Sequence, residues 1–110
     1  MKRREVDIQL SILRYLKNIG AVAGKTKTMG VRRGKSFCYD PYLFVGFPDI
    51  TCFYRSQLFF IEVKSEQGKL SDAQIYFQSL CKTANIPYIV AHSLDEVLEV
   101  IQPEIAHPLS

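Results

Sequence analysis

The sequence predicts a single α/β domain with a mixed β-sheet and elements in the order α-β-β-β-α-β-α. An amphipathic helical pattern opens the chain, and two adjacent runs rich in β-branched and aromatic residues follow near its centre. A second helical pattern then leads to a short apolar strand, as in a parallel crossover unit. The 110 residues, 47% hydrophobic and 23% charged, suit one globular core and exclude disordered and fibrous classes. We assign residues 1–102 to this domain and 103–110 to a C-terminal tail.

The first helix is predicted over residues 3–19, because the apolar pattern stops before Gly20, which suits the left-handed position after a helix end. Its apolar side chains fill two neighbouring arcs that cover more than half of the circumference. They are Ile8, Ile12, Tyr15, Leu16 and Ile19 on one arc, and Val6, Leu10 and Leu13 on the next. Such a helix is expected to pack against its own sheet and against a second subunit, which predicts a homodimer. Glu5 falls on the first arc and is expected to point inward or along the edge of the core.

A strand over residues 21–28 and a basic, glycine-containing loop over 29–41 are predicted next. The clearest pair of strands is 49–55 and 58–64, which we interpret as an antiparallel hairpin turning at Ser56-Gln57.

This turn predicts the register of the hairpin. Asp49 would lie opposite Lys64, and Thr51 opposite Glu62. Residues two apart in a strand share a face, so Asp49, Glu62 and Lys64 are expected together on one side of the sheet.

Ser71 to Gln74 has the pattern of a capping box and predicts the start of the second helix. Residues 87–91 are predicted to form a buried strand, and Ser93 is predicted to cap a last helix that Pro103 ends.

Asp49, Glu62 and Lys64 are the residues most indicative of chemistry. Two carboxylates and a lysine at the ends of mostly apolar strands are costly unless something compensates their charge. Mg²⁺ binds one or two carboxylates, keeps several waters and completes its shell with phosphate oxygens, which fits Asp49 and Glu62. A lysine beside it can orient water or neutralise charge on a phosphate. The alternative is a plain salt bridge of Lys64 with Glu62 or with Asp49.

Several motifs in order resemble the VRR-NUC family of the PD-(D/E)XK nuclease superfamily. They are Gly46-Phe-Pro-Asp49, Phe60-Ile-Glu-Val-Lys-Ser65, Gly68-Lys-Leu-Ser71 and Gln74. The resemblance runs from Glu5 to about Ile101 and implies a restriction-endonuclease-like fold. It also implies that Asp49, Glu62 and the backbone carbonyl of Val63 bind Mg²⁺ or Mn²⁺, and that Lys64 contacts the attacking water and the phosphate.

The same resemblance gives roles to two further residues, each with an open alternative. Glu5 matches the glutamate of the first helix, which helps to hold the water shell of the metal, or it is an acid favoured by the helix dipole. Gln74 matches the glutamine after the Glu-X-Lys motif and orients water or backbone near the site, or it only reciprocates Ser71 in the capping box. We do not expect one side chain to do both.

Charge is divided unevenly along the chain. Residues 1–35 hold ten Lys/Arg against two acids, and residues 36–110 hold four against nine. Five cations without an acid between them are expected to contact a phosphate backbone rather than only solvent. They are Lys25, Lys27, Arg32, Arg33 and Lys35. No base-reading motif accompanies them, which favours recognition of DNA by shape.

These observations predict a metal-dependent DNA endonuclease. As a homodimer with two related sites it would suit branched DNA such as a four-way (Holliday) junction. Free-standing members of the family resemble junction resolvases in this respect. The alternatives are a flap, single-strand or duplex nuclease of a repair or restriction system, and a non-catalytic DNA-binding module. We expect no organic cofactor, no membrane association and a cytoplasmic location, because three dispersed cysteines indicate a reducing compartment and no apolar run could span a bilayer.

Overall fold

A computed structural model describes residues 4–26, 42 and 44–103 of the chain. The elements are α1 (Glu5–Asn18), β1 (Val22–Lys25), β2 (Ile50–Tyr54), β3 (Gln57–Val63), α2 (Asp72–Thr83), β4 (Tyr88–Ala91) and α3 (Leu94–Leu98). The predicted α/β class and element order are therefore confirmed, whereas the predicted basic loop and C-terminal tail lie largely outside the described residues. In the described part of the chain, no helix has the length and apolar composition needed to span a membrane.

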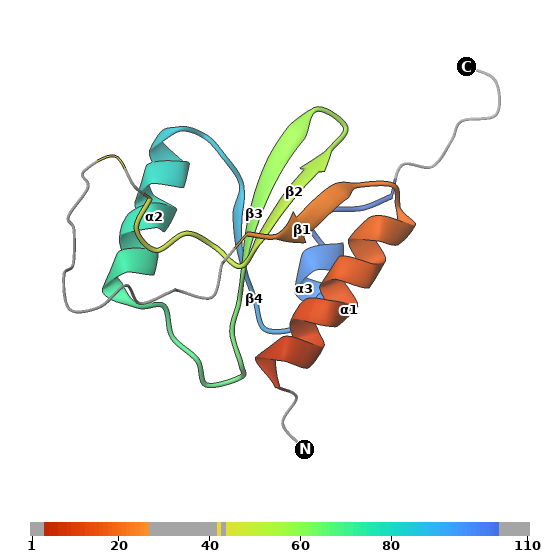
Figure 1. Cartoon of the computed structure of the whole chain (residues 1–110), viewed down its shortest axis with the longest axis horizontal. Coiled ribbons are helices and arrows are strands. Elements are labelled where there is room, and N and C mark those ends of the chain that lie inside the picture. Colours follow the sequence, from red (N-terminus) through yellow and green to blue (C-terminus); the bar gives the residue numbers. More distant parts are fainter. Residues whose placement is uncertain (1–3, 27–41, 43, 104–110) are drawn as a thin grey trace, which may run out of the picture.

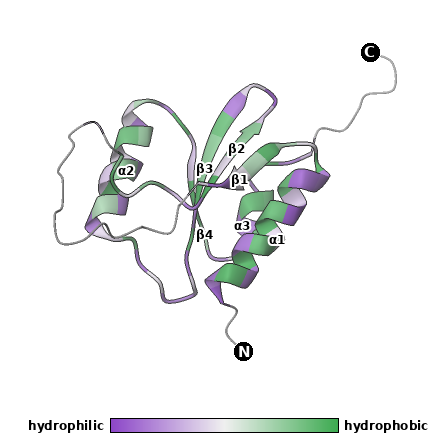
Figure 2. Cartoon of the chain, in the orientation of Figure 1, coloured by the Kyte–Doolittle hydropathy of each residue, from purple (hydrophilic) through white to green (hydrophobic). Residues whose placement is uncertain are grey.

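The four strands form one mixed sheet in the order β1-β2-β3-β4. The β1–β2 and β2–β3 pairs are antiparallel, and β4 is parallel to β3, as the crossover through α2 predicts. Figure 1 shows α2 on one side of this sheet and α1 with α3 on the other. Each face of the sheet is thus covered by helix, which explains why β3 is largely apolar on both sides (Figure 2).

The two faces carry separate cores. The larger lies between the sheet, α1 and α3 and includes Ile12, Leu16, Ile61 and Val97, each fully buried. The smaller lies under α2, where Phe60, Phe77 and Cys81 are buried. Residues of β3 alternate between these cores, so Glu62 points to the α2 side together with Phe60.

The hairpin of β2 and β3 turns at Arg55-Ser56, and the turn predicted at Ser56-Gln57 is wrong. Arg55 and Ser56 have φ of 54° and 65°, as a type I′ turn requires at both central positions, and Tyr54 pairs with Gln57. Continuing this register places Asp49 opposite Glu62 instead of Lys64. The two registers differ by two residues and bury the same side chains, so the apolar pattern could not separate them. Both registers place Asp49, Glu62 and Lys64 on the same face of the sheet, so that prediction does not depend on which of the two registers forms.

The predicted end of α1 at Gly20 and the predicted start of α2 at Ser71 are confirmed, whereas the predictions for the ends of α3 are not. Gly20 has φ of 86° just after α1, and Ser71 with Gln74 forms the predicted capping box of α2. Ser93 makes no side-chain cap on α3, and this helix ends at Leu98 before reaching Pro103, so both predictions for α3 are wrong. The carboxylate of Glu96 turns back instead and accepts a hydrogen bond from the backbone N–H of His92 at 3.0 Å.

Candidate active site

The candidate site lies at one end of the sheet, where β2 begins, β3 and β4 end, and α1 begins (Figure 1). Asp49 immediately precedes β2, and Glu62 and Val63 are the last residues of β3. Both carboxylates are withdrawn from solvent, with 9% of Asp49 and 1% of Glu62 exposed. Buried acids of this kind are rare unless paired or bound to a cation, which makes this pair the leading candidate for chemistry.

Asp49 is fixed by the backbone of the neighbouring strand. Its Oδ2 accepts a hydrogen bond from the N–H of Val63 at 2.9 Å, and its own carbonyl accepts one from the N–H of Thr26 at 2.9 Å. Asp49 therefore joins the end of β3 to the chain just after β1. The contact also holds the Val63 peptide unit beside the Asp49 carboxylate.

Glu62 is surrounded by donors. Its Oε2 accepts a hydrogen bond from Nε2 of Gln74 at 2.8 Å, and Nζ of Lys64 lies 3.7 Å from the same oxygen. The Lys64 side chain is 15% exposed, so the ammonium is only partly withdrawn from water. A hydrogen bond to a charged group is about twice as strong as a neutral one, so the bond from Gln74 and the ion pair with Lys64 each offset part of the cost of burying Glu62.

Gln74 forms the predicted capping box and, with its other polar group, contacts the side chain of Glu62 in the candidate site. Its Oε1 accepts a hydrogen bond from the backbone N–H of Ser71 at 2.8 Å and completes the capping box, while its Nε2 donates to Glu62. The expectation that one side chain cannot do both is wrong, because the oxygen and the NH₂ of an amide are separate groups that point in different directions. Gln74 thereby couples the start of α2 to the acidic site.

Glu5 lies at the edge of the site. Its Oε2 accepts a hydrogen bond of 3.2 Å from the backbone N–H of Ser65, directly after Lys64. The residue is exposed, so the edge position is correct and the inward-pointing alternative is wrong. Glu5 also lies in the first turn of α1, where the helix dipole favours an acid.

The turn before Asp49 is fitted tightly to α2. Gly46 has φ of 74°, and a Cβ built there would come within 2.2 Å of the carbonyl oxygen of Ala73. The ring of Phe47 packs against Phe60 and Phe77, with centroid distances of 5.3 Å and 5.1 Å. This close approach explains why the Gly-Phe-Pro-Asp motif begins with a glycine.

The donor set fits a hard divalent cation. Asp49 and Glu62 offer carboxylate oxygens, and the Val63 peptide beside them offers a carbonyl, which are the ligand types that Mg²⁺ and Mn²⁺ take. No cluster of three or more His, Cys, Asp or Glu residues that could hold a metal occurs among the described residues. Among those residues, the groups that could hold a metal here are the acidic pair and the carbonyl of Val63, which leaves positions for water and substrate.

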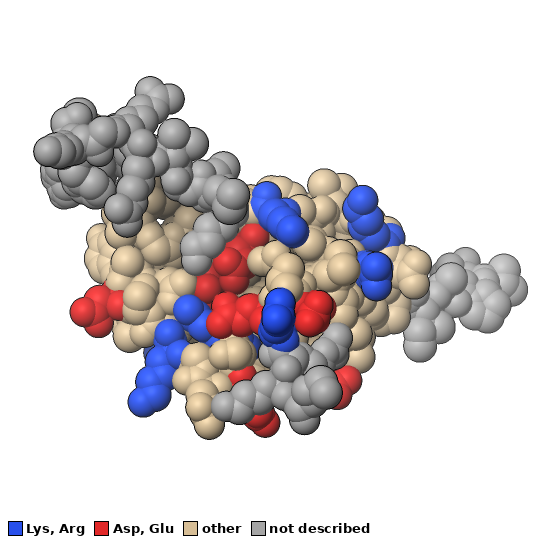
Figure 3. Space-filling view, turned by 60° about the horizontal axis from the view of Figure 1, so that its bottom comes forward, with Lys and Arg blue, Asp and Glu red and all other residues tan. Residues whose placement is uncertain are grey.

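Basic side chains lie near the acidic residues. Figure 3 shows acidic side chains gathered near the middle of the face at this end of the molecule, with Lys and Arg side chains beside them. Lys25, the first member of the predicted basic cluster, is exposed at the end of β1 and pairs with Ile50, the residue after Asp49. The other four members, Lys27, Arg32, Arg33 and Lys35, lie outside the described residues.

One residue close to the site was missed by the sequence reasoning. Tyr88 in β4 pairs with Phe60 and lies on the α2 side of the sheet, and its pKa is raised mainly by burial and further by the charges of Glu62, Cys81 and Asp49. A tyrosine within an apolar strand carries no distinguishing pattern, so only the fold could reveal its position.

Comparisons with known proteins agree with this geometry. The VRR-NUC domain matches residues 41–95, which include Asp49, Glu62, Lys64 and Gln74. A solved structure described as a VRR-NUC domain superposes with a TM-score of 0.66 at 21% identity, covering 89% of this chain and 94% of that chain. No curated protein matches the sequence. A VRR-NUC domain implies a nuclease of the PD-(D/E)XK type, a class that generally uses divalent metals and acts on DNA. The fold, the residues matched and the extent of the match together show that this chain belongs to the VRR-NUC family.

Proposed function

We propose that this protein is a Mg²⁺- or Mn²⁺-dependent endodeoxyribonuclease with the acidic pair at the end of β3 as its centre. The observation that carries the proposal is the burial of Asp49 and Glu62 side by side, with the ammonium of Lys64 3.7 Å from Glu62. A structural salt bridge alone would need one acid, whereas a site for a divalent cation uses both.

Each residue has a separate part in this proposal. Asp49, Glu62 and the carbonyl of Val63 would hold the cation, which when bound supplies Lewis acidity toward a phosphate oxygen and makes water more acidic. Lys64 would contact the scissile phosphate and the attacking water, where its positive charge offsets charge developing on the phosphate oxygens. Gln74 holds Glu62 in place, and Glu5 would orient water at the edge of the site.

We further propose that the substrate is branched DNA, such as a four-way junction, and that the active form is a homodimer. The apolar arc of α1 supports the dimer, since Val6 and Leu10 are 57% and 44% exposed. Two sites related by a twofold axis suit a substrate that has the same symmetry. Lys25 and the other cations of the basic cluster would follow the phosphate backbone, which predicts binding that weakens steeply with salt.

Cleavage of matched four-way, flap, single-stranded and linear duplex DNA tests the proposal. Glu62→Gln removes a carboxylate ligand of the cation, and Lys64→Ala removes a positive charge that offsets charge on the phosphate, so each should lower cleavage by at least about a hundredfold. Glu66→Gln and Lys17→Ala are matched controls, because these residues are exposed and Lys17 lies at the far end of α1. EDTA should abolish cleavage by the wild-type protein.

The substrates and variants separate the alternatives. DNA binding without cleavage by any variant would contradict the enzyme and favour a binding module. Cleavage that ignores branching would leave the nuclease and remove the junction preference. For the dimer, light scattering should give twice the chain mass of 12.6 kDa and Leu10→Glu should give the monomer, whereas a wild-type monomer would contradict it.

A further inference from the structure

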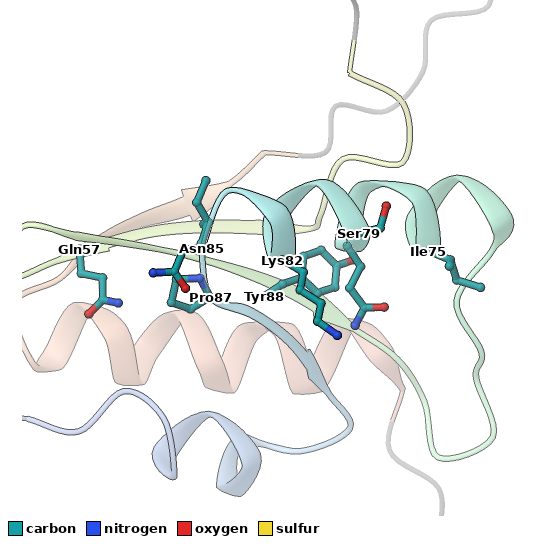
Figure 4. A pocket seen from close by; sticks show the side chains of 9 residues that line it. Gln57, Ile75, Ser79, Lys82, Asn85, Pro87 and Tyr88 are labelled. Atoms are coloured by element: carbon teal, nitrogen blue, oxygen red, sulfur yellow. The ribbon is translucent and has the colours of Figure 1, made fainter.

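Tyr88 occupies an unusual position beneath α2. It lies in β4 as the partner of Phe60, and its ring packs near Phe77 with centroids 6.3 Å apart. Figure 4 shows the ring under α2, extending from β4 toward the N-terminal half of the helix. Gln74 and its partner Glu62 lie at that end of α2. The ring thus extends from β4 through the smaller core in the direction of the acidic site.

The hydroxyl of Tyr88 is buried and, among the described residues, has no hydrogen-bond partner. Leaving a buried polar group unsatisfied is unfavourable. The ring packs against the smaller core, and polar side chains such as Gln78 and Ser79 line the pocket beside it, but the hydroxyl bonds to none of the described residues. A phenylalanine would therefore fill the same space without this penalty. Packing therefore does not account for the hydroxyl.

Electrostatics connects this hydroxyl with the two acids. Burial raises the pKa of Tyr88 well above its ordinary value, and the charges of Glu62, Cys81 and Asp49 raise it further, in that order. The phenol is consequently protonated throughout the physiological range and can donate a hydrogen bond. Glu62 and Asp49 are the carboxylates whose charge it senses, and Glu62 is on the neighbouring strand and the same face.

We propose that Tyr88 is a positioning residue of the acidic site, whose buried hydroxyl donates a hydrogen bond to Glu62 when that carboxylate holds a divalent cation. Glu62 would then be oriented by Gln74 from α2 and by Tyr88 from β4. The inference rests on the proposed function, because it concerns the carboxylate that would bind the metal. It adds to that function a residue outside the recognised motifs.

The test measures the affinity of the full chain for Mn²⁺ by calorimetry without DNA, together with thermal unfolding in EDTA. Tyr88→Phe should bind Mn²⁺ about tenfold more weakly, the effect of losing one hydrogen bond to a charged group. Its melting temperature in EDTA should equal or exceed that of the wild type, because an unsatisfied hydroxyl has been removed. Tyr76→Phe, on the exposed side of α2, is the matched control and should change neither quantity.

Glu62→Gln distinguishes failure of this inference from failure of the proposed function. If Glu62→Gln abolishes Mn²⁺ binding while Tyr88→Phe leaves it unchanged, the role of Tyr88 is refuted and the metal site stands. If neither variant alters Mn²⁺ binding, the acidic pair is not the metal site and both proposals fall. A lower melting temperature for Tyr88→Phe in EDTA would also refute the inference, since it would show a structural partner for the hydroxyl.

Discussion

Substitution of Gln74 by glutamate tests the contact that joins α2 to the acidic site. Gln74 is 5% exposed, and its two polar groups have different partners. In Gln74→Glu one carboxylate oxygen can still accept from Ser71 and keep the capping box. The other replaces an N–H donor, 2.8 Å from Glu62, with a negatively charged oxygen. The substitution therefore reverses a single interaction and leaves the helix cap in place.

The expected cost follows from that geometry. Loss of a hydrogen bond to a buried carboxylate costs about 1.5 to 3 kcal/mol. Two like charges about 4 Å apart near a protein surface repel by about 4 kcal/mol, although the pair can relieve this by taking up a proton. We therefore expect Gln74→Glu to lower the free energy of unfolding by about 3 to 4 kcal/mol at pH 7. This is a large part of the roughly 5 to 15 kcal/mol that a domain possesses.

The cost should also depend on pH with a definite sign. In the folded variant the shared proton raises the pKa of one carboxyl above its value in the unfolded chain. A group of this kind contributes stability at low pH that is lost as the pH rises through its folded pKa. The deficit of Gln74→Glu relative to the wild type should therefore shrink as the pH falls from 8 to 5.

Urea unfolding in EDTA, followed by circular dichroism across this pH range, measures the effect. Gln78→Glu is the matched control, since it adds the same charge one turn later on α2 with Lys82 four residues further on. It should change stability by less than about 0.5 kcal/mol, as is usual for surface substitutions. If Gln74→Glu and Gln78→Glu behave alike at every pH, the contact between Gln74 and Glu62 does not exist in solution.

Two further predictions concern the glycine turn and the buried thiols. Gly46→Ala should destabilise the protein by more than about 3 kcal/mol in urea unfolding, because its Cβ would overlap the Ala73 carbonyl. Gly24→Ala is the control and should cost little, because a Cβ at Gly24 would have no atom within 4 Å. Equal losses of stability in the two variants would contradict the close approach of Gly46 to Ala73. Burial raises the pKa of Cys52 to about 11 and also raises that of Cys81. In a Cys38→Ser chain both thiols should resist a disulfide reagent at pH 8 until urea unfolds the protein, and rapid reaction of the native chain would show that they are accessible.

The fold could be predicted because its signals are local and repeated. Apolar periodicity defines α1, the run of β-branched and aromatic residues defines β2 and β3, and Ser71 with Gln74 marks the start of α2. The sharing of a face by Asp49 and Glu62 was also predictable, because the predicted and observed registers differ by two residues and side chains alternate along a strand. A register shifted by one residue would instead have placed Asp49 on the opposite face.

The remaining features depend on contacts between distant segments. The position of the hairpin turn was not predictable, because both registers bury the same residues and Arg55 has no turn signature. The second hydrogen bond of Gln74 arises only when α2 packs over the end of β3. The burial of the Tyr88 hydroxyl likewise depends on α2 covering β4. In each case tertiary packing decides between local possibilities that the sequence leaves equal.

The position of α2 controls both acids of the candidate site. Gly46 lets the turn before Asp49 press against the backbone of Ala73, and the next residue, Gln74, holds Glu62. Adjacent residues at the start of one helix thus place the two carboxylates that would share a cation. A displacement of this helix would move both acids, so substitutions at Gly46 and Gln74 should not act independently on Mn²⁺ affinity. The capping box at Ser71 then matters to the proposed chemistry as well as to helix stability, because it fixes where α2 begins.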